Sequence, residues 1–556
     1  MATRSSRMLV QRTSSFQGER YKLSDSVRNL CKHTIISACT QFRVMDRVVL
    51  GQKTKVKQSS GIRMGSKVRY SRLYGSATNG VNAVSVIVET SIISGIPRHS
   101  IVGLPNGAVR EALDRIKSAL GASGFAIPRG AITVNLAPAD IRKEGTLYDL
   151  PIALGILAAD RMIPTEGIRA TDLFLGELSL NGAVRPVKGV LTAVLGAVRG
   201  GFQRVIVPWD NLQEASAITE IEVIAVKTLA EAASVIKGTF NPDARHYPRV
   251  KSVEGPLAHW PDISQVVGQR AAIRGLEIAA VGRHNIMLVG PPGCGKTLLC
   301  RAYQGLQARW TRAEQLETTS IHSLRGLTGS GIIPSRPFRA PHHSVSKAGL
   351  LGGGRPSLPG EISLANHGLL FLDELTEFDR SALEGLREPL EEGKVVISRA
   401  AGSVEYPAKF QLIAALNPCP CGYAGSGVKT CSCSQMERLR YSAKTSGPLL
   451  DRIDMRVVLR TVDPTAEQAI DAADSKSIKE RVDRAFELIQ ESGAPKFEPD
   501  ALQMLKRSIA QLQLSMRSLD RIAKVGRSIA ALDSREEVGP ADIAEALNYR
   551  ITDANS

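Results

Sequence analysis

The stretch NIMLVGPPGCGKTLLCRAY, residues 285–303, decides the fold of the central part of this chain. An apolar strand leads into a glycine-rich turn and then into a helix. Four residues fill the phosphate-loop pattern G-x-x-x-x-G-K-[ST]: Gly290, Gly295, Lys296 and Thr297. The glycines let backbone N–H groups wrap phosphates, the lysine reaches the outer phosphates, and the threonine hydroxyl binds Mg²⁺. Because strand, loop and helix follow in the required order, the stretch predicts a P-loop domain that uses ATP and Mg²⁺.

An acidic pair completes the predicted nucleotide site. HGLLFLDELTEF, residues 367–378, is an apolar strand followed by Asp373 and Glu374. Asp373 is predicted to hold Mg²⁺ through water, together with Thr297, and Glu374 to polarise the attacking water as the general base. An acidic strand end is also ordinary turn chemistry, but the phosphate loop upstream favours catalysis. The predicted nucleotide-binding residues are Gly290, Pro291, Pro292, Gly293, Cys294, Gly295, Lys296, Thr297 and Asp373.

Three more polar residues are candidates for the reaction. A third apolar strand, FQLIAALNP, ends at Asn417, whose amide would sit beside the γ-phosphate and orient water. Arg452 in SGPLLDRIDMRVVL and Arg517 in LSMRSLDRIAKV would neutralise charge on the transferred phosphoryl group, from a lid or across a subunit boundary. Taken alone, either arginine is more often a surface ion pair.

The motifs then resemble a known family. GPPGCGKT, PFRAPHH, LLGGG, PGEISLANHGLLFLDEL, NPCPCGY and SGPLLDRID follow one another in this order. They resemble the magnesium-chelatase-like branch of AAA+ ATPases, and the chain is similar to the ComM/YifB family, in which a Lon-protease-like domain precedes the AAA+ module. The resemblance covers about residues 75–550. It implies an AAA+ fold, a homo-hexameric ring and ATP-driven branch migration of DNA during natural transformation, with branched or single-stranded DNA as the partner.

The resemblance also implies two projections toward the pore of the ring. Asp373 lies 76 residues beyond Thr297, and residues 320–354 would form an insertion in the second helix. KVVISRAAGSVEY, residues 394–406, would form a hairpin with its turn at Ala401 and Gly402. Basic side chains of these loops would contact DNA phosphates and position the strand without reading bases. They are Arg339, Lys347, Arg355 and Arg399.

Two adjacent histidines, His342 and His343, stand in the expected insertion. They could be metal ligands. Adjacent histidines rarely share one ion, so packing of the loop or hydrogen bonding to its backbone is favoured.

The N-terminal part resembles the Lon proteolytic domain through RPVKGVLTAVLGA and VIVPWDN. A protease of that type needs a serine nucleophile and a lysine base. The matching stretches carry Leu147 where the serine would fall and Leu191 where the lysine would fall. Leucine can serve as neither, so this part is predicted to be a binding or assembly module.

Four cysteines cluster after Asn417 in the pattern C-x-C-x₉-C-x-C: Cys419, Cys421, Cys431 and Cys433. Four thiolates within 15 residues can satisfy tetrahedral zinc, although the C-x-C spacing is tighter than the usual C-x₂-C. The alternative is a reduced, cysteine-rich loop. Cys294 and Cys300, in and after the phosphate loop, are predicted to be packing residues.

Composition indicates a globular protein rather than a membrane protein. The 556 residues are 43% hydrophobic and 22% charged, and no apolar run approaches the ~18 residues that a membrane span needs. The net charge of +17 suggests nucleic-acid binding, but residues 1–74 alone carry +13, from 16 lysines and arginines against three acids. The rest of the chain carries only +4, so the overall charge says little about function.

The basic leader, residues 1–74, has three interpretations. It is rich in serine, without periodicity and without the apolar core of a signal peptide. It would be a solvated basic tail, an organelle transit peptide, or upstream codons translated from a misplaced start near Met64. The last is favoured because the ordered pattern begins only after Arg72. With no signal peptide, the eight cysteines favour a reducing, cytoplasmic location over a disulfide framework.

The fold class is therefore predicted as α/β: a Lon-protease-like domain, then an AAA+ P-loop core and a helical lid. The expected boundaries are a leader at 1–74, the Lon-like module at 75–240, a linker at 241–262, the ATPase core at 263–463 and the lid at 464–556. Two other functions stay open. One is a chelatase-type subunit that inserts Mg²⁺ into a porphyrin, which would need a partner with a metal-binding integrin-like domain. The other is a protease or protein-remodelling chaperone.

Overall fold

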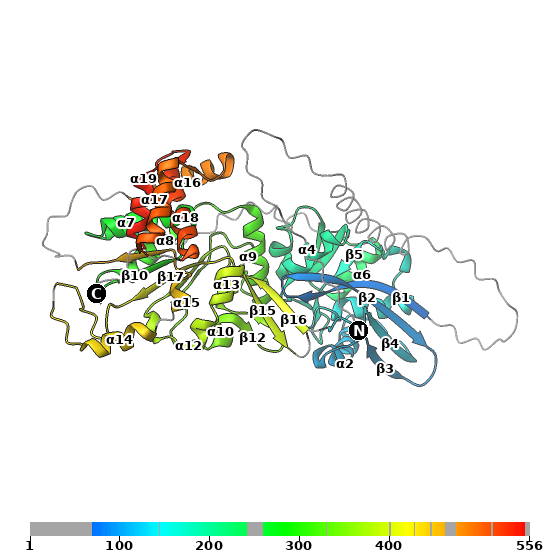
Figure 1. The fold of residues 1–556 in the computed structure, drawn as a ribbon. Coiled ribbons are helices and arrows are strands. Elements are labelled where there is room, and N and C mark those ends of the chain that lie inside the picture. The colour runs from blue at the N-terminus through cyan, green and yellow to red at the C-terminus, as the bar shows by residue number, and fades with distance from the viewer. Residues whose placement is uncertain are drawn as a thin grey trace, which may run out of the picture. The chain divides into compact units, whose positions relative to one another are not determined.

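The computed structural model of the chain describes residues 69–143, 145–241, 260–329, 331–399, 402–427, 429–444, 447–461, 474–512 and 515–550 (Figure 1). Predictions for residues 1–68 and for most of the 241–262 linker fall outside these ranges. Within the described ranges, no helix combines the length and the apolar character needed to cross a membrane.

The N-terminal module begins with a four-stranded sheet of order β1-β2-β4-β3. Its strands are β1 (Arg69–Asn79), β2 (Asn82–Ile93), β3 (Arg98–Val102) and β4 (Ala131–Ala137). Two helices pack against it and share its apolar core: α2 (Gly107–Ala122) and α3 (Asp149–Ala159). Strand structure starts earlier than residue 75, the start expected from the sequence. Tyr70 and Arg72 are exposed, whereas the residues that follow each of them, Ser71 and Leu73, are buried. This alternation is the period-two pattern of a half-buried strand. The polar Ser71 at an inward position and the aromatic Tyr70 at an outward position concealed that pattern in the sequence.

A second, parallel sheet of order β5-β8-β9 completes the module. Its strands are β5 (Asp172–Phe174), β8 (Arg204–Pro208) and β9 (Glu222–Val226), and its helices are α4 (Val190–Arg199), α5 (Leu212–Ala215) and α6 (Leu229–Lys237). A small hairpin joins β6 (Glu177–Leu178) to β7 (Val184–Arg185). Leu147 and Leu191, where we expect the serine and the lysine of a Lon-type protease to fall, are both buried in one apolar cluster of this module. Their packing shows that both positions serve the core.

The central domain is a five-stranded parallel sheet of order β11-β14-β17-β10-β18. Its strands are β10 (Ile286–Val289), β11 (Phe338–Arg339), β14 (Leu369–Leu372), β17 (Gln411–Leu416) and β18 (Met455–Val458). β10 and β14 are buried at every position, as expected of parallel strands covered on both faces. α7 (Arg270–Gly282) packs on β18, and α8 (Lys296–Gln304) packs on β17. Because the strands are parallel, their carboxyl ends meet at one edge, where ligands of open α/β sheets bind.

The insertion begins later than the sequence predicted. Helix α9 (Arg312–Arg325) runs unbroken through Ser320 and ends at Gly326, whose φ is 70°. The expected start of the insertion at residue 320 is therefore wrong. Phe338 and Arg339 form the edge strand β11 instead of a projecting loop. The insertion is therefore the segment between β11 and β14, residues 340–368, and it contains α10 (Lys347–Leu351), β12 (Gly352–Gly353), β13 (Leu358–Pro359) and α11 (Glu361–Leu364).

The predicted hairpin is present as β15 (Lys394–Arg399) and β16 (Gly402–Pro407). Gly402 pairs with Arg399 and belongs to strand β16, so it is not a turn residue as predicted, whereas Ala401 lies outside the described ranges. The hairpin packs on the insertion, because the Tyr406 hydroxyl donates a hydrogen bond to the Ser357 carbonyl at 2.7 Å. Insertion and hairpin therefore form one surface, and their elements lie together in Figure 1.

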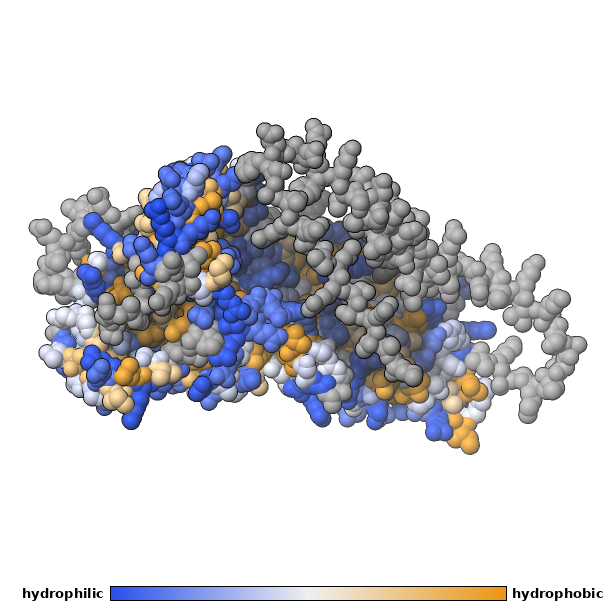
Figure 2. Space-filling model, viewed as in Figure 1, coloured by the Kyte–Doolittle hydropathy of each residue, from blue (hydrophilic) through white to orange (hydrophobic). Residues whose placement is uncertain are grey.

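Helices follow β18, as the periodicity predicted. In the part of the chain described after residue 473 they are α16 (Ser475–Ser492), α17 (Pro499–Leu512), α18 (Met516–Leu532) and α19 (Pro540–Asn548). α18 buries Ile522, Val525 and Ile529 and packs on α7 and α16. Their visible outer face is largely hydrophilic (Figure 2). These helices share one apolar core with the central sheet.

Candidate ATP site

The phosphate loop joins β10 to α8 and is shaped by its glycines. Gly293 and Gly295 have φ values of 79° and 91°, in the region that favours glycine. A Cβ at either position would meet no atom within 4 Å, so the backbone conformation alone calls for glycine there. α8 starts directly at Lys296, and the N-terminus of a helix presents free N–H groups to an anion. The loop therefore fits a chain of phosphates.

Lys296 links the phosphate loop to the neighbouring strand end. Its Nζ atom donates hydrogen bonds to the carbonyls of Gly290 at 2.7 Å and Pro291 at 3.0 Å. The same atom lies 3.0 Å from Oδ1 of Asn417. The sequence predicted these two side chains separately, and the adjacent parallel strands β10 and β17 bring them together. A phosphate bound at Lys296 would therefore also face the amide of Asn417.

Thr297 and Asp373 also meet. The Thr297 hydroxyl donates to Oδ2 of Asp373 at 2.9 Å, and Oδ1 of Asp373 accepts the backbone N–H of Glu374 at 3.0 Å. A hydroxyl and a carboxylate are hard oxygen donors of the kind that Mg²⁺ takes, usually with waters and phosphate oxygens completing its shell. The two side chains thus fit a Mg²⁺ ion that arrives with a nucleotide.

Glu374 adopts an unusual backbone conformation just beyond β14. Its φ of 52° and ψ of 51° place a non-glycine residue in the left-handed region, a strain that clusters at functional sites. Its side chain is 59% exposed, and Oε2 lies 3.9 Å from Nδ1 of His343. Glu374 and Asn417 both line an open pocket of about 520 Å³. A base at this position can reach water.

The two adjacent histidines of the insertion contact different residues: His342 contacts Ser344, and His343 contacts Glu374. His342 accepts a hydrogen bond from the Ser344 backbone N–H at 3.3 Å, as the sequence predicted for a loop-packing residue. The ring centroids of His342 and His343 lie 4.0 Å apart with their planes tilted by 35°, and Nδ1 of His343 lies 3.9 Å from Oε2 of Glu374. The sequence did not predict that contact.

The two candidate arginines converge on one carboxylate. Arg452 lies 2.7 Å and Arg517 3.4 Å from Oε1 of Glu391, at the end of α13 (Arg387–Glu392). Arg452 is only 10% exposed and also donates to the Arg387 carbonyl at 3.1 Å, whereas Arg517 is 65% exposed. Within a single chain, both guanidinium groups are thus held by Glu391, which no sequence pattern singled out.

Three of the four basic residues expected to meet DNA are exposed on the surface formed by insertion and hairpin: Lys347, Arg355 and Arg399. A Cβ added at Gly353 would lie 3.3 Å from Nη2 of Arg399, so the hairpin arginine lies against the insertion. Arg339 differs. Its guanidinium forms two hydrogen bonds with Glu361, at 2.6 and 2.8 Å, and is thereby engaged inside the chain.

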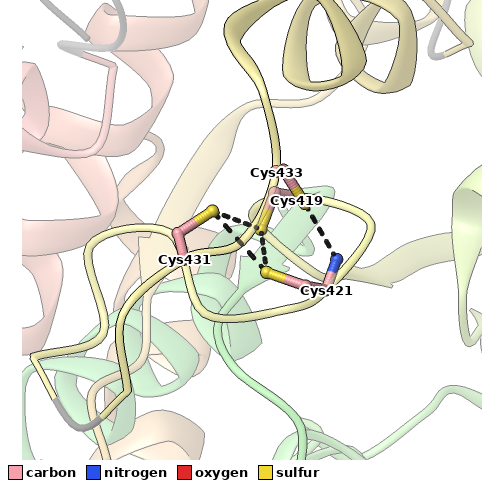
Figure 3. A group of neighbouring side chains, drawn as sticks. All are labelled: Cys419, Cys421, Cys431 and Cys433. Atoms are coloured by element: carbon pink, nitrogen blue, oxygen red, sulfur yellow. Dashed lines mark hydrogen bonds between the residues drawn. The ribbon is translucent and has the colours of Figure 1, made fainter.

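The four cysteines after Asn417 converge, as Figure 3 shows, and their sulfur atoms all lie within 4.8 Å of one another. A hydrogen bond from the backbone of Tyr423 lowers the pKa of the Cys421 thiol to about 5. The loop leads into α14 (Gln435–Lys444). In contrast, Cys300 is buried alone in the core, and burial raises the pKa of its thiol well above the ordinary value. Cys300 therefore packs, as predicted.

Comparisons with known proteins agree with this geometry. Three family models match: magnesium chelatase, subunit ChlI, over residues 262–467; subunit ChlI of Mg-chelatase over 88–211; and the ChlI C-terminal model over 472–550. Competence protein ComM of Haemophilus influenzae is 38% identical over 497 residues, covering 86% of this chain and 97% of that protein. The uncharacterized protein YifB of Escherichia coli is 38% identical over 498 residues, covering 86% and 96%. The chain belongs to the ComM/YifB family.

Membership in the ComM/YifB family fixes the general chemistry. These proteins are magnesium-chelatase-like AAA+ ATPases, a class of enzyme that uses a nucleotide and Mg²⁺. A shorter match, 29% identical over 192 residues, joins the chain to Lon protease 2 of Bacillus subtilis and covers 31% of this chain and 34% of that protein. The predicted arrangement of a Lon-like α/β part and an AAA+ part is thereby confirmed.

Proposed function

We propose that this ComM/YifB protein is a ring-forming motor that hydrolyses ATP in the cytoplasm to move DNA, as a branch-migration helicase. The observation that carries the proposal is the exposed cationic surface formed by insertion and hairpin. Lys347, Arg355 and Arg399 come from two elements that pack together. Cations on adjacent loops suit the phosphates of a DNA strand and need no particular base sequence.

The same surface is joined to the ATP site. β11 leads into the insertion and pairs with β14, which ends directly before Asp373 and Glu374. His343, on the insertion, lies beside Glu374. Binding or hydrolysis of ATP can therefore shift the DNA-facing loops in two ways, through the pairing of β11 with β14 and through the contact between His343 and Glu374. A motor requires such a connection.

Each polar group of the site has a task in hydrolysis. Lys296 and the loop N–H groups would hold the outer phosphates, and Thr297 and Asp373 would hold Mg²⁺, whose charge would neutralise that of the phosphates. Glu374 accepts a proton from the attacking water, and Asn417 orients that water. The reaction gains mainly from positioning and charge stabilisation, because the transferred phosphoryl group needs little covalent help.

Assembly would complete the site. In a homo-hexameric ring, Arg452 or Arg517 would leave Glu391 and meet the nucleotide at a subunit boundary. An arginine supplied in this way accelerates phosphoryl transfer by about 10³–10⁵ in well-studied systems. Glu391 is a suitable resting partner because it already binds both guanidinium groups.

One assay separates this proposal from its rivals. ATPase activity is measured with branched DNA, with a porphyrin and with an unfolded protein, each against buffer. Stimulation by branched DNA alone is expected. Stimulation by the porphyrin would favour the chelatase-type function that the matching family models are named for, and stimulation by the unfolded protein would favour a chaperone. Either result without a DNA effect overturns the helicase proposal.

A further inference from the structure

The spacing of the four clustered sulfur atoms points to a shared metal ion (Figure 3). Sγ of Cys419 lies 3.3 Å from that of Cys421 and 3.6 Å from that of Cys431, and Cys421 and Cys431 are also 3.6 Å apart. A disulfide bond is about 2.05 Å long. Four sulfurs held about 2.3 Å from one zinc ion stand about 3.8 Å from one another. The observed separations are therefore close to those of a zinc tetrahedron and too long for disulfides.

We propose that Cys419, Cys421, Cys431 and Cys433 bind one structural zinc ion and that this ion holds α14 across the mouth of the ATP site. Four thiolates exclude Mg²⁺ and Ca²⁺, which take oxygen ligands. They also fill every position of a tetrahedron and leave none for a water or substrate. The ion is therefore structural and takes no part in the chemistry of hydrolysis.

Backbone groups support the sulfur atoms in the way that metal thiolates require. The N–H of Ala424 donates to Sγ of Cys419 at 3.3 Å, and the N–H of Cys421 donates to Sγ of Cys433 at 3.3 Å. Such second-sphere hydrogen bonds orient ligands and tune the metal they hold. Cys419 is fully buried, so the domain core fixes the position of this ligand. The other three cysteines are partly exposed, so an ion can reach the site from solvent.

The cysteine loop touches the phosphate loop directly. Gly422 directly follows Cys421 in the sequence. Its φ is 85°, and its N–H donates a hydrogen bond to the Cys419 carbonyl at 2.9 Å. A Cβ at Gly422 would lie only 2.6 Å from Cδ of Pro292. Since only one residue separates Asn417 from Cys419, the proposed zinc site joins the water-orienting amide to the phosphate loop.

Helix α14 is not held in place by a buried face. None of its residues is buried, so packing alone cannot fix it. It starts next to Cys433 and reaches the catalytic strand end through two contacts. The hydroxyl groups of Tyr441 and Thr376 lie 2.9 Å apart, and Lys444 lies 3.5 Å from Glu377. These contacts place α14 on one wall of the pocket that Glu374 lines, and a metal at the helix start would keep it there.

Metal analysis tests the site without any need for activity. Full-length protein purified without chelator is expected to carry about one zinc per chain, the stoichiometry of a closed four-thiolate site. Cys431→Ser with Cys433→Ser should remove that zinc. Cys294→Ser, a thiol outside the cluster, should keep it. Absence of zinc from native protein that also fails to take up added zinc overturns the site, as does iron in its place or zinc retained in the double variant.

Limited proteolysis tests the role of the ion. Trypsin can cut α14 at Arg438 and Arg440, and zinc-loaded protein should resist cleavage there while chelator-treated protein is cut faster. Equal cleavage rates would overturn the claim that the ion holds the helix. Cobalt(II) substitution gives a second readout, because a tetrahedral thiolate site produces strong charge-transfer and d–d absorption. Absence of that spectrum in protein that binds cobalt would overturn the ligand set.

The activity arm rests on the ATPase chemistry of the proposed function. The double cysteine variant should keep nucleotide binding, because the Lys296 contacts lie outside the cluster, but lose turnover. If the native protein binds zinc but DNA does not stimulate its ATPase activity, the metal site is supported and the proposed DNA motor is overturned. If DNA stimulates the ATPase activity but the native protein binds no zinc, the motor is supported and the metal site is overturned. A zinc-free double variant with unchanged turnover overturns the claimed link between the ion and the ATP site.

Discussion

His343 Nδ1 lies 3.9 Å from Oε2 of Glu374, so a residue of the insertion touches the predicted general base. The two residues follow the paired strands β11 and β14, respectively. His343 therefore has the position of a sensor that reports the state of the insertion to the site of hydrolysis. We expect it to set how strongly DNA stimulates ATP turnover.

Replacing His343 with alanine should weaken that coupling. We expect the ratio of DNA-stimulated to basal ATPase to fall by about two- to fivefold, the effect of losing a partly exposed polar contact worth up to ~1 kcal/mol. Nucleotide affinity should not change, because Lys296 and its partners are untouched. His342→Ala is the matched control: His342 bonds within its own turn and should keep the ratio. An equal fall in both variants would reduce His343 to a packing residue.

Lys296→Ala and Glu374→Gln should both stop turnover, for different reasons. The first removes the cation that holds phosphates, so nucleotide binding should weaken along with catalysis. The second leaves binding intact and should lower the rate by about 10²–10⁴, the contribution of a general base. Binding of a fluorescent nucleotide and steady-state ATPase distinguish the two. Near-normal hydrolysis by Glu374→Gln would show that another group accepts the proton.

Arg452 should act on the nucleotide of a neighbouring subunit. Arg452→Ala is expected to lose activity by about 10³ or more, if it stabilises the transferred phosphoryl group. Mixing this inactive variant with inactive Lys296→Ala should restore some ATPase, since mixed rings contain intact boundaries. Arg380→Ala, which removes an exposed i,i+4 ion pair with Glu384, should remain active by itself. Mixed assembly without any recovery would place the action of Arg452 within its own chain.

The exposed cations of insertion and hairpin should dominate DNA binding. Arg399→Ala and Lys347→Ala should each weaken binding and reduce the slope of log affinity against log salt by about 0.7–0.9, the value of one phosphate contact. Lys117→Ala, on α2 of the N-terminal module, is the control and should leave the slope unchanged.

Removal of residues 1–63 provides the opposing test. If the loops hold the DNA, the shortened protein should keep both its salt slope and its DNA-stimulated ATPase. Loss of all binding would instead assign the contact to the basic leader, and the loop cations would have another use.

Local patterns predicted three strands of the central sheet, β10, β14 and β17, because each leads directly into residues of the predicted site. Asp373, Glu374 and Asn417 follow apolar runs that read as buried strands, and the parallel topology then gathers them. Glu391 could not be predicted in the same way. Its partners Arg452 and Arg517 are distant in sequence, and a carboxylate in a charged helix has no distinguishing local pattern.

The errors have a similar physical origin. We expected helix α9 to be interrupted at Ser320, where the family's insertion would begin. The helix continues to Arg325 because Gly326, with a left-handed backbone conformation, ends it. β11 has only two residues, too few for an alternating pattern, and forms because β14 offers it an edge. Edges and long-range pairs are tertiary properties, and sequence patterns describe them poorly.

The brevity of β11 limits which insertions and deletions the chain can tolerate. Phe338 pairs with Leu369 and Arg339 with Leu370. A shift of one residue would turn both side chains to the opposite faces of the sheet, taking Phe338 away from the ring of Phe371 and Arg339 away from Glu361. Length changes beyond Arg339 carry no such penalty, because surface loops absorb them. Relatives can therefore diverge in how far this loop extends, but a single codon gained or lost next to β11 would need a compensating change nearby.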